Sequence, residues 1–520
     1  MDKKRNERRY LIVNTMIYDG TKTDPFCGSI LIEDEEIIEV KKHPKKGMEP
    51  PECFDGKVID GAGLATMPGF IDIHTHSDIS IFAAPDASAK VFQGVTTDVI
   101  GNCSIGPAPS SSHLKDWSWR KNEENWLKRA GIDPSVQSWE KWSDFARTLK
   151  DHKKGINIAG LVPHGPVRAK VMGFSKEKAT AADLKEMKDH IKDGMEAGAF
   201  GFSSGLTYTP SKYSTIQELV EISKEVAKFD GYYASHIRSE RDELIEAIEE
   251  AILIGIKASV PIQISHFKVM GRSNWGLIER GIELINQHLD SVDITCDVYP
   301  YIFSSTFPQS LKTLTENGDN FLQKKEGVYW EDIIIIDHPN KEYIGKNLKE
   351  VAKEENIGCQ QWLKNNWDEE EIGVKIESIS ITDLEKAIKF PKSMIGSDSY
   401  GMNASEVFTS SWVNPRNFGA FPKVFKDFVR EGILSWSEAV NKMTLMPATK
   451  LGLKDRGMIT AGMKADLTIV SKDDFEDQAT LANPFRYSKG IEFVFINGKP
   501  VIKNGKLTGS KPGAFLEKSR

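Results

Sequence analysis

Apolar and polar positions in the middle of the chain follow a repeating rhythm, in which a short apolar run alternates with a longer amphipathic stretch. Helices are predicted after the capping residue Thr180 to Glu196, after Ser214 or Thr215 to Phe229, and over 243–255 and 277–288. Strands are predicted over 199–203, 232–237, 260–265 and 292–298. The alternation indicates a parallel sheet with helices outside it, and a closed (β/α)8 TIM barrel is the leading choice at this length.

An open, doubly wound sheet is the alternative architecture for the same alternation of strands and helices. When such a sheet binds a nucleotide, a glycine-rich turn follows its first strand. This sequence has no such fingerprint at that place, which weakens the alternative. Residues 66–450 are therefore expected to form one α/β barrel domain.

Both ends of the chain have the pattern of strands instead. Apolar and β-branched residues fill 10–18, 29–40, 465–470 and 491–496, and turn signals such as Asp19-Gly20 and Asn497-Gly498 separate them. We expect a small β-sandwich domain assembled from both termini, residues 1–65 and 451–520. Residues 309–370 break the rhythm of the middle and are rich in charge, so they are expected to form an insertion or a lid over the active-site face.

The composition limits the possible partners. The 520 residues are 39% hydrophobic and 28% charged, with a formal net charge of −7, so no nucleic acid or acidic membrane is expected as a partner. No apolar stretch approaches the ~20 residues of a membrane span, and we expect a cytoplasmic protein. The five cysteines show no close pairing pattern and their number is odd, which argues against a disulfide framework.

Candidate metal ligands stand at the ends of predicted strands. His74 and His76 end an apolar strand two positions apart, so their imidazoles project to the same side, as a metal ion requires. Four further residues follow other apolar runs in the same way: Cys103, His236, His266 and Asp398. Strand ends converge on one mouth of a barrel, and six such side chains suffice for one or two metal ions. His164 also follows an apolar strand and could either support the site or be structural.

Several short motifs then resemble one family in particular. They are His-Thr-His-Ser-Asp at 74–78, Gly-Val-Thr-Thr at 94–97, Gly-Asn-Cys at 101–103, Gly-Phe-Ser-Ser-Gly-Leu-Thr-Tyr at 201–208, Ser-His-Ile-Arg at 235–238, Ile-Ser-His-Phe-Lys at 264–268, Asp-Val-Tyr-Pro-Tyr at 297–301 and Gly-Ser-Asp at 396–398. The tail segments 462–467 and 497–501 are similar too. The chain thus resembles the D-aminoacylase, or N-acyl-D-amino-acid deacylase, branch of the amidohydrolase superfamily.

The resemblance implies roles for the candidate ligands. Cys103, His236 and His266 would form a tight metal site, and His74, His76 and Asp398 a second, weaker one. A thiolate among imidazoles favours zinc over magnesium or calcium. The implied reaction is hydrolysis of the amide bond of an N-acyl-D-amino acid by metal-activated hydroxide, with Asp398 as the proton shuttle.

The substrate of that reaction also carries an α-carboxylate. The resemblance suggests that Lys268, Tyr299, Ser305 and Arg416 bind it. Arg416 suits the role because a guanidinium can grip a carboxylate through two parallel hydrogen bonds. The family commonly has His-Pro-Arg where this chain has Asn414-Pro415-Arg416, so the substrate preference could differ.

Two other functions fit parts of the same pattern. A cyclic-amide amidohydrolase, similar to a hydantoinase or a dihydroorotase, would usually place a bridging lysine where this chain has Cys103. A non-catalytic barrel that serves as a scaffold would usually have lost metal ligands, whereas all six candidates are present. The acyl group, the side chain of the substrate and the oligomeric state are left open.

Overall fold

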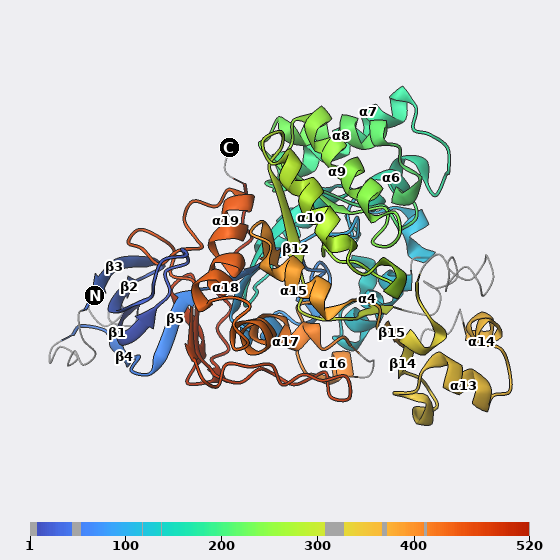
Figure 1. Ribbon diagram of the computed structural model, residues 1–520. Helices are drawn as coiled ribbons and strands as arrows, with labels where there is room; N and C mark the ends of the chain where they lie inside the picture. The colour runs from blue at the N-terminus through green and yellow to red at the C-terminus, as the bar shows by residue number, and fades with distance from the viewer. Residues whose placement is uncertain are drawn as a thin grey trace.

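The computed structural model describes residues 8–43, 54–116, 118–136, 138–306, 327–366, 372–409 and 413–518. Figure 1 shows a central barrel wrapped by helices, a sheet formed near the N-terminus on one side, and a small separate unit on the other. Among the described residues, no helix is long and apolar enough to cross a membrane.

Eight parallel strands form the barrel, as predicted. They are β6 (Phe70–Asp72), β7 (Val95–Ile100), β8 (Asn157–Pro163), β9 (Gly201–Gly205), β10 (Tyr232–His236), β11 (Ile262–Ile264), β12 (Ile294–Val298) and β16 (Ser393–Ile395). Each is paired with its neighbours in this order. The seam between β16 and β6 is joined just beyond the strand ends by a parallel bridge between Thr75 and Ser399. The barrel is therefore closed at its mouth, where the candidate ligands stand.

Helices cover the outside of the barrel. Those nearest to the predictions are α7 (Ala181–Glu196), α8 (Ile216–Ala227), α9 (Leu244–Ala258) and α10 (Leu277–His288). The others include α4 (Ser118–Arg129), α5 (Trp142–Asp151), α6 (His164–Met172), α15 (Ile381–Lys389), α17 (Arg416–Val424), α18 (Trp436–Met443) and α19 (Leu445–Leu451). Thr180 caps α7 in a capping box with Asp183, and the Thr215 hydroxyl caps α8. Short-range capping chemistry thus sets where these helices begin.

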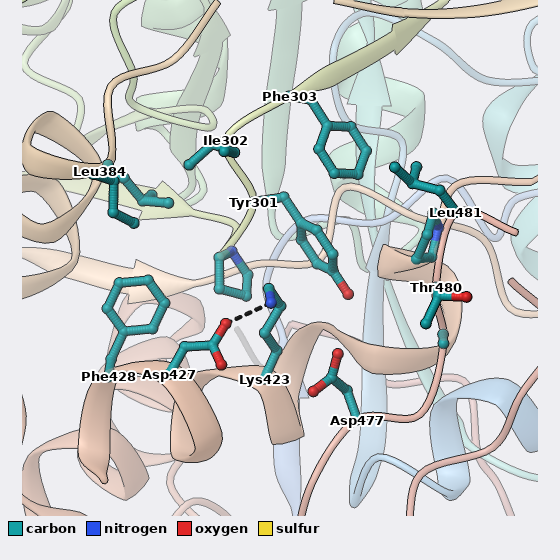
Figure 2. A pocket seen from close by; sticks show the side chains of 14 residues that line it. Tyr301, Ile302, Phe303, Leu384, Lys423, Asp427, Phe428, Asp477, Thr480 and Leu481 are labelled. Carbon is teal, nitrogen blue, oxygen red and sulfur yellow. Dashed lines mark hydrogen bonds and ion pairs between the residues drawn. The ribbon is translucent and has the colours of Figure 1, made fainter. Parts of the chain in front are cut away.

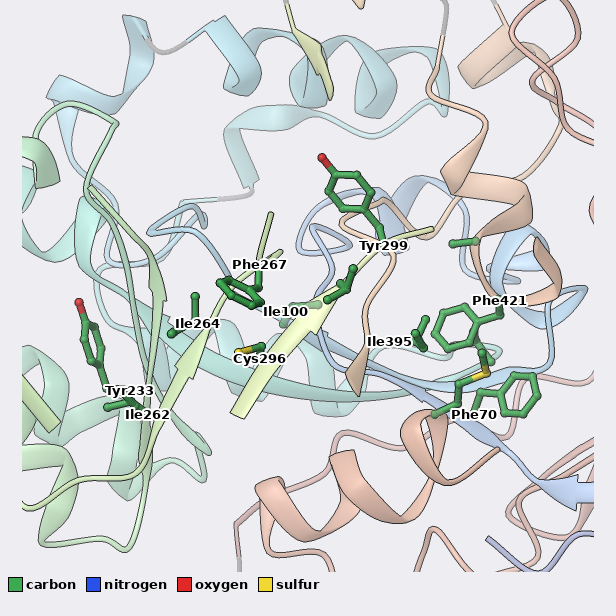
Figure 3. Packing of buried hydrophobic residues seen from close by; sticks show 14 of the residues in the cluster. Phe70, Ile100, Tyr233, Ile262, Ile264, Phe267, Cys296, Tyr299, Ile395 and Phe421 are labelled. Carbon is green, nitrogen blue, oxygen red and sulfur yellow. The ribbon is translucent and has the colours of Figure 1, made fainter. Parts of the chain in front are cut away.

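The main core lies between the barrel strands and these helices. Figure 3 shows part of it, with Ile262, Ile264 and Cys296 on neighbouring strands. Phe70 stacks on Phe421 of α17 with ring centroids 5.6 Å apart, which ties the first strand to a late helix. Burying one such side chain contributes roughly 1.5–3 kcal/mol. The core therefore holds together elements that are distant in sequence.

The two termini contribute to one sheet domain. Its strands are β1 (Arg9–Ile17), β2 (Phe26–Glu33), β3 (Glu36–Lys42), β4 (Lys57–Asp60), β5 (Leu64–Pro68), β17 (Leu467–Ser471), β18 (Ile491–Ile496), β19 (Lys499–Lys503) and β20 (Lys506–Leu507). The antiparallel pairing of β5 with β17 joins the N-terminal strands to the C-terminal ones. The two halves of the expected sandwich are thus hydrogen-bonded into one continuous nine-stranded sheet. Asn497 and Gly498 both have positive φ in the turn between β18 and β19, as predicted for a tight hairpin.

The unusual segment after β12 forms a unit with its own core. The strands β13 (Ser304–Thr306), β14 (Ile333–Asp337) and β15 (Gly373–Ile376) pair into an antiparallel sheet, accompanied by α13 (Leu348–Glu354) and α14 (Cys359–Asn366). Trp330 and Trp362 are buried in this core. Residues 309–326 and 367–370 of the predicted insertion lie outside the described residues. The lid role and the domain boundaries remain predictions.

The insertion rests on the loop that follows β11. The Gly271 amide and the Trp275 indole both donate to the carbonyl of Ser378, each at 2.9 Å. Arg272 forms an ion pair with the buried Asp332 of the insertion. The same loop begins with His266, so the insertion contacts the segment that follows one of the predicted ligands.

Candidate metal centre

All six predicted ligands lie together at the carboxyl ends of the barrel strands. His74 and His76 follow β6, Cys103 follows β7, His236 ends β10, His266 follows β11 and Asp398 follows β16. Two groups of three have all their donor atoms within 4.8 Å of one another: His74, His76 and Cys103 in one, Cys103, His236 and His266 in the other. Cys103 belongs to both groups, so it stands between the two predicted metal positions.

The distances around Cys103 and Asp398 describe a tight cluster. Cys103 Sγ lies 3.2 Å from His74 Nε2 and 3.4 Å from His266 Nε2. Asp398 Oδ1 lies 3.0 Å from His76 Nε2 and 3.6 Å from His74 Nε2. Cys103, His266 and Asp398 all have positive φ, an uncommon backbone conformation that is concentrated at functional sites.

The electrostatic surroundings favour ionised ligands. Burial opposes ionisation of the Cys103 thiol, but the neighbouring His74 and His266 imidazoles outweigh it and hold its pKa well below the usual range. Burial likewise opposes ionisation of Asp398, yet the Arg416 guanidinium and the His76 hydrogen bond hold the pKa of that carboxyl well below its usual value. A thiolate and a carboxylate are the forms that bind a metal ion.

The donor set passes a test for a borderline metal such as zinc. The Thr207 hydroxyl is hydrogen-bonded to His236 Nε2 at 2.9 Å, while the buried Nδ1 of the same ring has no hydrogen-bond partner among the described residues. Nδ1 of the buried His76 is also without a partner in the described part of the chain. Such unpaired buried nitrogens beside a thiolate fit the nitrogen and sulfur coordination of zinc.

Two carboxylates that the sequence analysis did not single out contact the rings of two of the predicted ligands. Asp297 Oδ1 lies 2.9 Å from His74 Nδ1 and accepts from the His266 amide at 2.8 Å. Glu240 Oε1 lies 2.6 Å from His266 Nδ1. Carboxylates in this position fix the ring orientation of metal-binding histidines. A signal existed for Asp297, which opens one of the family-like motifs and is the next-to-last residue of its own apolar strand.

The predicted carboxylate-binding residues also gather at this mouth. Arg416 Nη2 forms an ion pair with Asp398 Oδ2 at 2.9 Å, and its guanidinium lies 4.9 Å from the ring centroid of Tyr299. Lys268 Nζ lies 5.5 Å from the same ring and forms an ion pair with Glu240 at 2.5 Å. Asn414 accepts from the Arg416 amide at 3.0 Å, so it helps to begin α17. Ser305 lies in β13, and its side chain lies outside the described residues.

Tyr208 is a further residue of the mouth that the sequence analysis did not single out. It follows β9, and its ring meets His236 edge-on with centroids 4.9 Å apart. It nevertheless leaves 44% of its surface exposed. The ring therefore stands at the open side of the ligand cluster, and its position in the 201–208 motif was the available signal.

A cavity of about 270 Å³ lies beside the segments that carry Tyr299 and Arg416. Figure 2 shows its apolar walls, which include Phe303 and Phe428, and the Lys423–Asp427 ion pair at its edge. Pro300 and Pro415 also line it, next in sequence to the two predicted carboxylate-binding residues. None of the six predicted metal ligands lines this cavity, so it is separate from the ligand cluster.

Comparison with known proteins gives the class of this molecule. The sequence model of the amidohydrolase family matches residues 129–501, and the chain belongs to that family. D-aminoacylase of Alcaligenes xylosoxydans xylosoxydans is 31% identical over 466 residues, 89% of each chain. N-acyl-D-glutamate deacylase of the same organism is 29% identical over 463 residues, 88% of each chain. These relatives confirm the predicted resemblance to the D-aminoacylase branch.

Solved structures agree with the fold and with metal binding in the branch. N-acyl-D-glutamate deacylase from Bordetella bronchiseptica, complexed with zinc and a phosphonate inhibitor, matches with a TM-score of 0.81 and 27% identity, over 99% of this chain and 100% of that one. A D-hydantoinase structure matches with a TM-score of 0.53 at 15% identity, which shows a shared fold alone. The cyclic-amide alternative is thus the more distant one.

Proposed function

We propose that this chain is a zinc-dependent hydrolase that cuts the amide bond of N-acyl-D-amino acids into a carboxylate and a free D-amino acid. The observation that carries the proposal is the pair of buried ligand groups sharing Cys103 at the barrel mouth. The names of the relatives, a D-aminoacylase and an N-acyl-D-glutamate deacylase, supply the substrate class and its handedness. The partner is therefore a small molecule.

In this proposal, Cys103, His236 and His266 hold the tight zinc ion, and His74, His76 and Asp398 form a second, weaker position. The bound ion supplies a Lewis acid that lowers the pKa of a water toward ~7 and polarises a carbonyl. Asp297 and Glu240 hold the rings of His74 and His266 in position through the contacts described above. The chain itself thus contributes both the ligands and the carboxylates that orient them.

Asp398 is proposed to move the proton. Its Oδ1 faces His74 and His76, while its Oδ2 is held by Arg416. Because its low pKa keeps it ionised, the carboxylate is ready to accept a proton from the attacking water. It then returns that proton to the leaving nitrogen, as a general acid does.

Arg416, Lys268, Tyr299 and Ser305 are proposed to bind the α-carboxylate of the substrate. Arg416 Nε is buried and has no hydrogen-bond partner among the described residues, so it has a donor left for a ligand. The Arg416 and Lys268 cations lie near the same Tyr299 ring, which gathers positive charge at one place. Two cations and hydroxyl groups suit a carboxylate.

Chiral product analysis tests this function. The purified protein, loaded with zinc, is incubated with matched N-acetyl-D- and N-acetyl-L-amino acids, with a chelated sample as the control. Chelator-sensitive release of D-amino acids alone is the expected result. Equal release of both enantiomers would overturn the handedness. No release from any substrate by protein with zinc demonstrably bound would overturn the substrate class, and cyclic amides would be assayed next.

A further inference from the structure

A chain of four buried polar side chains leads from the barrel wall to the residue after Cys103. Glu218 Oε1 lies 3.0 Å from His164 Nε2, His164 Nδ1 lies 2.9 Å from Ser211 Oγ, and Ser211 Oγ lies 2.5 Å from Ser104 Oγ. All four residues are at least 98% buried. These hydrogen bonds connect α8, α6 and the loop after β9 with the loop after β7.

The partners set the direction of these hydrogen bonds. The Glu218 carboxylate also accepts from Arg168 Nε at 3.1 Å, so it is an acceptor and His164 Nε2 donates to it. In the neutral imidazole, Nδ1 then accepts from the Ser211 hydroxyl. With its proton used in this way, Ser211 Oγ accepts from the Ser104 hydroxyl. The imidazole therefore determines how Ser104 is held.

The serine, histidine and glutamate follow the order of a hydrolase triad, but the geometry excludes that reading. Ser211 Oγ is engaged on both sides, and only 1% of the residue is exposed. No substrate can reach a nucleophile in that position. These hydrogen bonds therefore stabilise a part of the protein and do not carry out a reaction on a substrate.

The part that these hydrogen bonds hold is a strained turn at residues 103–104. Cys103 and Ser104 are consecutive non-glycine residues with φ of 52° and 67°, and a residue in this left-handed region costs on the order of 1–2 kcal/mol. The Ser104 amide donates to Ser203 Oγ at 3.1 Å, and its hydroxyl is bound to Ser211. A side chain on Gly205 would meet the Cys103 carbonyl at 2.2 Å, so the turn is also pressed against β9. Surrounding contacts hold a conformation that the turn itself disfavours.

We propose that His164 is a positioning residue that, through Ser211 and Ser104, holds the turn presenting the Cys103 thiolate to the metal. The inference rests on the proposed function only in taking Cys103 as a zinc ligand. Residues that orient metal ligands typically change metal affinity or activity by 10–100-fold when they are mutated. Loss of one of these hydrogen bonds therefore lowers zinc affinity without a change in any zinc ligand.

The first test compares two serines of similar burial. Ser211→Ala removes the bridge between His164 and Ser104. Ser204→Ala is the matched control, because Ser204 is also fully buried but bonds to Tyr233 and Ser235 instead. Zinc affinity is measured by competition with a chelator, and cobalt-substituted protein reports the thiolate-to-metal absorption band. Ser211→Ala is expected to bind zinc about tenfold more weakly and to shift the band, while Ser204→Ala matches the wild type.

The second test separates the two nitrogens of His164. His164→Asn keeps an acceptor near the Nδ1 position and so keeps the bond to Ser211, whereas His164→Gln keeps a donor near Nε2 and so keeps the bond to Glu218. Both variants lose one buried hydrogen bond, and their melting temperatures should fall by similar amounts. Zinc affinity is expected to fall about tenfold in His164→Gln and much less in His164→Asn.

Each outcome has one meaning. Wild-type zinc affinity in both Ser211→Ala and His164→Gln, with a lowered melting temperature, would overturn the inference and leave the network a purely structural one. Equal losses of affinity in His164→Asn and His164→Gln would also overturn it, since the Ser211 bond would then not matter. Failure of the wild-type protein to bind zinc at all would count against the proposed function instead.

Discussion

The two ends of the barrel both contain buried charges, but they satisfy them differently. At the mouth, ionised side chains pair with one another, as in the contacts of Asp398 with His76 and Arg416. At the opposite end, buried lysines donate to backbone carbonyls beside strand starts. Lys442 Nζ reaches the carbonyls of Phe390 and Ser393 at 2.6 and 2.9 Å, and Lys450 Nζ reaches that of Ile262 at 2.9 Å.

The difference teaches how to separate chemistry from stability in this molecule. Charged side chains that pair with one another at the mouth can exchange partners with a metal or a substrate. The lysines at the other end donate to backbone carbonyls. They hold the strand ends in place and take no part in binding a ligand. In enzymes with this fold, the active site lies at the carboxyl ends of the strands, while the other face supports stability. Substitutions at the two ends should therefore change different measurements.

The largest effect is expected from Cys103→Ala, which removes the ligand shared by both groups. Bound zinc should be lost, and hydrolysis should fall to background, on the order of 10⁴-fold or more, because a catalytic metal contributes several kcal/mol. Metal content and turnover are the measurements. Cys296→Ala, at a buried cysteine in the core between the barrel strands and the outer helices, is the control and should keep its zinc. Stoichiometric zinc in Cys103→Ala would contradict the ligand assignment.

Asp398→Asn is expected to lower kcat by about 10²–10⁴-fold, the usual contribution of a positioned acid–base group. The amide retains the shape of the carboxylate but cannot accept and return a proton. Substrate binding should persist, which a competitive-binding measurement with the substrate can show. Turnover close to that of the wild type would remove Asp398 from the proton transfer.

Asp297, near the carboxyl end of β12, and Asp293, just before its start, give a direct comparison of the barrel ends. Asp297→Asn weakens the acceptor for His74 and His266 at the mouth, and zinc affinity should fall about 10–100-fold. Asp293→Asn weakens only the 3.1 Å contact with Lys450 at the other end, and zinc affinity should not change. Equal zinc affinities in the two variants would break the proposed division between the ends.

The effect that is smallest per unit of pH concerns Lys442, whose pKa is lowered by burial to about 7. Between that pH and the ordinary lysine pKa near ~10.4, the unfolded chain binds one more proton than the folded one. The free energy of unfolding should therefore rise with pH in this window, by up to ~1.4 kcal/mol per pH unit, while the penalty of the buried charge is fully present below pH ~7. Denaturant unfolding of the wild type and of Lys442→Met at several pH values measures this pH dependence. The same pH dependence of the free energy of unfolding in both proteins would contradict the prediction.

Local signals made much of the fold predictable. Thr180 with Asp183 marked the start of α7, and the hydrophobic period delimited α10 at the residues where it lies. The strand ends predicted which six side chains would meet, because parallel strands in a barrel all point their carboxyl ends to one face. These are properties of short segments combined with one rule of topology.

Features that depend on long-range pairing were not predictable in the same way. The continuity of the terminal sheet follows from the pairing of β5 with β17, which no local pattern encodes. The place of Cys103 in both ligand groups depends on the turn at 103–104. The role of His164 was open for the same reason, since its partners Ser211 and Glu218 come from other elements.

The bridge between Thr75 and Ser399 has a consequence for the order of events during synthesis and folding. During synthesis, His74 and Cys103 leave the ribosome long before β16, yet Asp398 can join them only when that last strand closes the ring. Contacts between such distant segments form slowly. In the proposed function, binding of a metal ion by all six side chains is thus a late step of folding, and the Cys103 thiol has to stay reduced until the last strand of the barrel has been made.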